Sequence, residues 1–73
     1  MKITIESTSK MVFFNGVPCR IWEGKTESGI PMHCFITRIG VAANEDQTEF
    51  VRELEEHKPP SPEVQAIPLR MIL

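Results

Sequence analysis

The chain has 73 residues, of which 41% are hydrophobic and 25% are charged, and its net charge at pH 7 is −2. This length fits one domain, residues 1–73, with a small core, and the composition is typical of a globular chain rather than a disordered one. A net charge this small does not predict nucleic-acid binding, and no apolar run approaches the roughly 20 residues that span a bilayer.

Two features point to a cytoplasmic protein. The chain has only two cysteines, Cys19 and Cys34, so it is not a disulfide-dense secreted scaffold. The N-terminal residues 1–7 alternate between apolar and polar, whereas a signal peptide has a continuous apolar region. We therefore expect reduced thiols, a cytoplasmic location and no membrane association.

The first half of the chain predicts an antiparallel meander. Lys2–Glu6 alternates with a period of two, which is typical of a half-buried strand, and Ser7–Lys10 reads as a short polar turn. Met11–Phe14 is an apolar run that predicts a second strand, buried on both faces or lying at a partner surface. Asn15-Gly16 then predicts a type I′ turn, because both residues tolerate a positive φ.

The centre of the chain predicts a hairpin with strands at Val17–Glu23 and Ile30–Val41, joined by the glycine-bracketed loop Gly24–Gly29. The second strand offers two alternating rows, and a slip of one residue would exchange them. The register that joins the most apolar rows buries Met32, Cys34 and Ile36 on the same face as Val17, Cys19 and Ile21, so that the two cysteines share a face. It leaves one mixed aromatic and polar face, which consists of Arg20, Trp22, His33, Phe35 and Thr37.

The last third predicts one helix over Gln47–His57 and a final strand. Asp46 with Glu49 has the spacing of a capping box, and Asn44 with Gln47 is the rival frame. The apolar stripe of this helix, Phe50, Val51 and Leu54, predicts packing on the sheet. Residues 45–58 carry six acids and two bases, a net −4 that leaves +2 elsewhere, so the outer helix face is acidic and solvated.

The C-terminal segment is apolar again, and we expect Leu69–Leu73 to form a last strand at a sheet edge because Pro68 cannot donate a ladder hydrogen bond. The elements together predict an α+β fold. It is a small antiparallel sheet of four to five strands, built from meanders and hairpins, with one α-helix packed on one face.

Residue types that support catalysis or metal binding are few. Cys19, His33, Cys34 and His57 are the only soft metal ligands, and adjacent His33 and Cys34 point to opposite faces of a strand. That geometry also keeps a thiol nucleophile from its base, and no phosphate loop, serine elbow or paired-carboxylate motif is present. We expect no metal, no cofactor and no enzymatic activity.

Two surfaces are candidates for binding. The first is the aromatic and basic sheet face, which comprises Arg20, Trp22, His33, Phe35, Thr37 and Arg38. Tryptophan and arginine are enriched in protein-interface hot spots, and aromatic rings between cations also stack on bases. Self-association as a homodimer, packing of the helix, a different protein partner and nucleic acid all remain open. The second surface is the hairpin tip, Lys25, Thr26 and Glu27.

Several segments resemble short uncharacterised proteins of bacterial viruses and prophages: residues 15–24, 28–31 and 35–39, and the ending 68–73. This resemblance implies a viral accessory protein that works in the bacterial host cytoplasm on a host or viral protein, and it assigns no catalytic or binding residue. We therefore expect a small, homodimeric, non-catalytic protein-interaction module. The alternative is a small nucleic-acid-binding module that uses Arg20, Trp22, His33 and Phe35 with Lys25 and Arg38.

Overall fold

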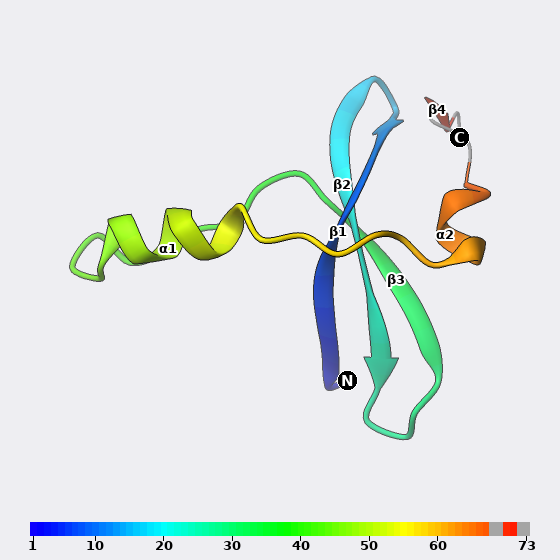
Figure 1. The fold of residues 1–73 in the computed structure, drawn as a ribbon, viewed down its shortest axis with the longest axis horizontal. Helices are drawn as coiled ribbons and strands as arrows, with labels where there is room; N and C mark the ends of the chain where they lie inside the picture. The colour runs from blue at the N-terminus through cyan, green and yellow to red at the C-terminus, as the bar shows by residue number, and fades with distance from the viewer. Residues whose placement is uncertain (68–69, 72–73) are drawn as a thin grey trace.

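The computed structural model describes residues 1–67 and 70–71, and it shows an α+β fold with one main helix (Figure 1). Three antiparallel strands form the body of the sheet, β1 (Ile3–Phe14), β2 (Val17–Thr26) and β3 (Pro31–Ile36). They are followed by helix α1 (Gln47–Leu54), the short helix α2 (Pro62–Gln65) and the two-residue strand β4 (Arg70–Met71).

The strand order is β3-β2-β1-β4, and β4 pairs with β1 in parallel at Phe13 and Phe14. An antiparallel sheet of four to five strands is therefore not confirmed, since three antiparallel strands are present in the described part of the chain. Residues 69, 72 and 73 of the predicted C-terminal strand lie outside the described residues.

β1 is one long strand, so the prediction of two strands separated by a turn at Ser7–Lys10 is wrong. The register shifts between the pairs Ser7↔Trp22 and Met11↔Arg20, which makes this segment a β-bulge. The Thr8 hydroxyl donates to the carbonyl oxygen of Ile21 at 2.7 Å and accepts from the Lys10 backbone N–H at 3.2 Å. The strand continues because this side chain replaces hydrogen bonds that the shifted ladder leaves unmade.

The turn after β1 is predicted correctly. Asn15 has φ 51° and Gly16 has φ 80°, the two positive values that a type I′ turn requires. β2 then runs further than predicted, through Gly24 to Thr26, and these residues pair with the start of β1. A Cβ atom on Gly24 would clash with the carbonyl oxygen of Thr4, so only glycine fits at this position.

The predicted register between β2 and β3 is wrong by one residue. Phe35 lies opposite Ile21, and Cys34 lies opposite Trp22. The turn between the strands determines this pairing: the Thr26 N–H donates to the Ile30 carbonyl oxygen at 3.0 Å. Because partners in a sheet share a face, the turn brings the row of Phe35, rather than the row of Cys34, to the side of Ile21.

The core lies on this side of the sheet, which we call the inner face. Among the described residues, the buried apolar side chains are Val12, Cys19, Ile21 and Val64, and the half-buried side chains packed on them are Phe14, Phe35 and Ile67. Val64 belongs to α2, so this short helix covers the inner face. Its position is fixed by Glu23, whose carboxylate accepts from the backbone N–H and the hydroxyl of Ser61 at 3.2 and 2.9 Å.

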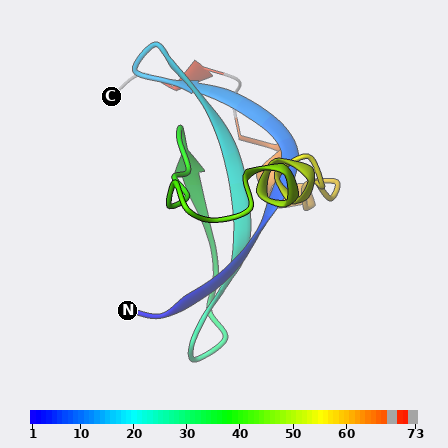
Figure 2. The ribbon, with the colours of Figure 1, turned by 90° about the vertical axis from the view of Figure 1, so that its left-hand side faces the viewer.

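α1 begins as predicted, because the Asp46 side chain accepts from the Glu49 N–H at 2.9 Å and caps the helix. It ends at Leu54 rather than His57, since the following segment joins β1: the Lys58 N–H donates to Ser7 at 3.1 Å, and the Ser9 N–H donates to Lys58 at 3.0 Å. The prediction that this helix packs across the sheet is wrong. α1 extends away from the strands (Figures 1 and 2), and none of its residues is buried by the described part of the chain.

Candidate protein-binding groove

α1 and the outer face of the sheet, which is the side opposite the core, border a groove of about 450 Å³. The sheet side of this groove is lined by Met11, Pro18, Arg20, Trp22 and Ile36. The segment after β3 adds Thr37, Arg38 and Ile39, and the helical side adds Val51, Leu54, Glu55 and His57. We refer to these twelve residues as the groove.

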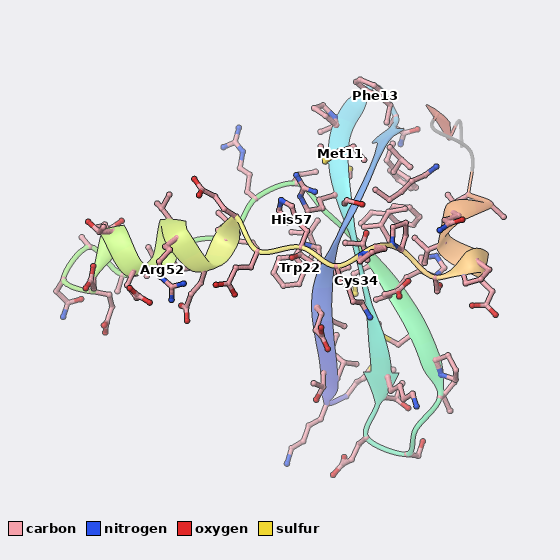
Figure 3. All side chains as sticks on the ribbon, viewed as in Figure 1. Met11, Phe13, Trp22, Cys34, Arg52 and His57 are labelled. Atoms are coloured by element: carbon pink, nitrogen blue, oxygen red, sulfur yellow. The ribbon has the colours of Figure 1, made fainter. Side chains whose placement is uncertain are left out.

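Alternation along the strands explains the apolar lining. Val12 points into the core, so its neighbours Met11 and Phe13 point outward and are 43% and 50% exposed. Across the groove, Val51 and Leu54 of α1 are 50% and 39% exposed. Figure 3 shows Met11 and Phe13 further along the sheet from Trp22 and His57. The outer face and the helix thus present apolar side chains toward the same opening.

The two sides of the groove carry opposite charge. Arg20 is half-buried, and its Nη1 donates to the Thr8 carbonyl oxygen at 2.9 Å, which holds the guanidinium on the sheet. Arg38 is exposed and forms no ion pair with any residue that the structure describes. On the helical side Glu55 lines the groove, and Arg52 of α1 pairs with Glu49 and Glu56. The sheet side is therefore basic, and the helical side is acidic.

The predicted aromatic and basic face does not exist as one surface. Arg20, Trp22, Thr37 and Arg38 line the groove, whereas His33 and Phe35 lie on the inner face because of the corrected register. There the Phe35 ring lies 5.4 Å from Phe14 and 5.5 Å from His33 between centroids. The residues that sequence reasoning did not assign to this site include Met11, Ile36, Val51, Leu54 and His57.

Some of these residues carried a usable signal. The apolar stripe of α1 is visible in the sequence, where it predicts packing on the sheet, and Met11 belongs to an apolar run for which the sequence predicts either burial on both faces or a partner surface. His57 had no such signal, since its position depends on the backbone pairing of Lys58 with β1.

The hairpin tip is a separate surface. Lys25 and Thr26 end β2, and Glu27 begins the turn, where its N–H donates to the Lys2 carbonyl oxygen at 3.0 Å. The Thr26 hydroxyl accepts from the Ile30 N–H at 3.1 Å. Figure 1 shows this turn at the lower end of the sheet, whereas α1 lies beside the middle of the strands. The tip is therefore a well-bonded connection that does not contribute to the groove.

The thiols and the remaining polar groups offer little chemistry. Cys19 is buried on the inner face, and Cys34 is half-buried on the outer face, so the prediction that they share a face is wrong. Within residues 1–67 and 70–71, no three His, Cys, Asp or Glu side chains are grouped to hold a metal ion. Ser7 Oγ lies 3.5 Å from His57 Nδ1, but its hydroxyl donates to the Glu56 carbonyl oxygen at 2.7 Å.

Glu23 is the acid whose environment is most distinctive. Partial burial by itself raises the pKa of this carboxyl, but hydrogen bonds from Ser61 and the ion pair with Lys58 at 3.2 Å outweigh that effect. The pKa of Glu23 therefore lies below its ordinary value of 4.5. Because these partners position α2, we assign the carboxylate a structural role.

The helices in the described part of the chain are too short and polar to cross a lipid bilayer. Comparisons of the chain with protein-family models, with curated proteins and with solved structures found no match.

Proposed function

We propose that this protein is a small non-catalytic interaction module that binds a partner protein in the groove. The observation that carries the proposal is the exposure of the apolar side chains of α1. Its apolar side chains Val51 and Leu54 face the outer side of the sheet without being buried by any described residue. An amphipathic helix in a protein gains its stability mainly by packing its apolar side, so an exposed apolar side indicates that this helix packs against a partner molecule.

The surface area supports a missing contact of standard size. The chain exposes 5623 Å², whereas a compact protein of 8.3 kDa is expected to expose about 4,600 Å². The excess of roughly 1,000 Å² is comparable to the ~800 Å² that each partner buries in a stable protein interface. The radius of gyration agrees, at 13.4 Å against about 11.2 Å for a compact chain of this length.

The composition of the groove is that of a protein interface. Trp22, Arg20 and Met11 are residue types enriched at protein interfaces, and tryptophan and arginine are also enriched at hot spots; the three residues lie together on strands β1 and β2. Arg38 at the rim provides a cation for an acidic group. The partner segment that fits this groove best has apolar anchors flanked by a carboxylate.

The arrangement of nucleophiles supports a non-catalytic role. His33 and Cys34 lie on opposite faces of the sheet, and Ser7 is buried with its proton donated to a backbone carbonyl. The nucleic-acid alternative loses its stacking platform, because Phe35 is on the inner face and the acidic α1 borders the groove. A salt titration separates the two functions, since nucleic-acid affinity falls steeply with salt.

The biological setting that we propose follows from the resemblance of the chain to short proteins of bacterial viruses and prophages. In that setting the protein is an accessory protein of the bacterial cytoplasm, and its partner is a host or viral protein. Such a role needs a binding surface and no chemistry of its own.

A comparison of capture by matched variants tests the proposal. Tagged wild-type protein, a groove variant with Leu54→Asp and a tip variant with Lys25→Ala are used to isolate partners from a bacterial lysate, and binding of the purified partner is then measured by calorimetry. We expect Leu54→Asp to weaken binding at least tenfold and Lys25→Ala to leave it unchanged. Binding that is lost in the tip variant, or retained by Leu54→Asp, would contradict a site in the groove.

A further inference from the structure

β3 is the edge strand of the sheet, and the backbone N–H and C=O groups of two of its central residues point away from β2. The Thr26–Ile30 pair is hydrogen-bonded, and hydrogen-bonded pairs alternate along an antiparallel ladder. With the observed register, Trp22↔Cys34 is one of the hydrogen-bonded pairs, whereas His33 and Phe35 belong to non-hydrogen-bonded pairs. The N–H and C=O groups of His33 and Phe35 therefore face away from β2. Neither residue makes a backbone hydrogen bond at this edge with the described part of the chain.

The two edges of the antiparallel sheet differ in how they are covered. The outer edge of β1 is paired with Lys58 at its bulge and with β4 near its end. β3 has the sequence Pro31-Met32-His33-Cys34-Phe35-Ile36, which contains no Lys, Arg, Asp or Glu. Natural edge strands usually carry charges, bulges or a cover that prevents pairing. In the described part of the chain, β3 has one such protective feature, the missing N–H of Pro31 at its first residue.

We propose that β3 pairs in antiparallel with β3 of a second copy of this chain, so that the two sheets become one continuous sheet. The outward backbone groups fix the register: His33 of each copy lies opposite Phe35 of the other, and each of these two pairs exchanges both backbone hydrogen bonds. The two-fold axis then passes beside Cys34. Pro31 lies outside the central pairs, so its missing N–H does not interrupt them.

The side chains along this edge also match those of a second copy of the same strand. The outer-face row of Met32, Cys34 and Ile36 meets the same row of the second copy, so apolar surface continues across the joint. The two grooves would lie on one surface, which offers a bivalent site, but the pairing at β3 does not depend on binding in the groove.

Cysteine cross-linking tests this register directly. In the proposed pairing the Cα atoms of the two Cys34 residues form a non-hydrogen-bonded pair about 4.5 Å apart, which is within the range of a disulfide. The variant Cys19→Ser, which keeps Cys34, should give a disulfide-linked dimer on mild oxidation. The control combines Cys34→Ser and Cys19→Ser with Met32→Cys. Its two cysteines are displaced by four residues, roughly 13 Å along the strands, and should not cross-link.

Solution mass provides the second measurement. We expect light scattering to give twice 8.3 kDa for the wild type. His33→Pro removes an outward N–H without removing a bond to β2 and should give a folded monomer by circular dichroism, whereas His33→Ala should remain a dimer. Equal cross-linking from positions 32 and 34, or a wild type that stays monomeric at high concentration, would overturn the proposal. If His33→Pro does not fold, the cross-linking result decides. Failure of this dimer would leave capture by the groove unaffected.

Discussion

Replacing Thr8 by valine isolates the hydrogen bonds that hold the bulge in β1. The side chain is completely buried, and its hydroxyl contacts Ile21 and Lys10 within the strands. Valine has nearly the same shape, so the change leaves the buried carbonyl oxygen of Ile21 without its donor. Such a loss costs about 1–3 kcal/mol. A chain of this length has a total stability of about 4–11 kcal/mol, so the loss is a large fraction of it.

Urea and thermal unfolding, followed by Trp22 fluorescence and circular dichroism, provide the assay. For a loss of about 2 kcal/mol we expect the melting temperature to fall by roughly 8–16 °C. The matched control is Thr8→Ser, which keeps the hydroxyl and loses one methyl group, at about 0.8 kcal/mol. If Thr8→Val unfolds like the wild type, or if Thr8→Ser is the less stable variant, the hydroxyl does not support the bulge.

Three further perturbations follow from the fold. In urea titrations, Gly24→Ala should destabilise the sheet by more than about 3 kcal/mol, because the added Cβ clashes with backbone atoms of Thr4 and Ile5. Gly40→Ala is the control: its Cβ would lie in open space, and it should change stability by less than ~0.5 kcal/mol. Folding lowers the pKa of Glu23, so the stability that this carboxylate contributes is fully present above its ordinary pKa of 4.5 and is lost as the pH falls through the lowered pKa. On acidification, the unfolding midpoint of Glu23→Gln should therefore decline less than that of the wild type. Asp46→Ala removes the cap of α1 and should reduce helical dichroism, at a helix cost of about 1 kcal/mol, without moving the unfolding midpoint of the sheet.

Local signals in the sequence predicted local structure well. The Asn15-Gly16 turn and the Asp46 cap depend on the conformations and hydrogen bonds of a few adjacent residues, and both are present as expected. The bulge at Thr8 could not be predicted in the same way. Its polar residues look like a turn until their partners on β2 and in the segment after α1 are known.

Only part of the candidate site could be predicted from the sequence, because the rest depends on the register between β2 and β3. Alternation along β2 alone places Arg20 and Trp22 together, and this part of the prediction agrees with the structure. Assigning Phe35 to the same face required the pairing of two strands, which the turn at Thr26 determines against the more apolar alternative. The contribution of α1 to the groove could not be predicted, because an apolar stripe indicates that a helix packs but does not identify the surface it packs against.

Hydrogen exchange of the α1 amides in the purified protein tests the central claim, that no residue of this helix is buried by the described part of the chain and that the groove is open to a partner. We predict that residues 47–54 exchange with little protection while β1 and β2 are strongly protected, and that the helix becomes protected when a captured partner is added. Protection of α1 equal to that of the sheet in the purified protein, without a partner, would contradict the claim.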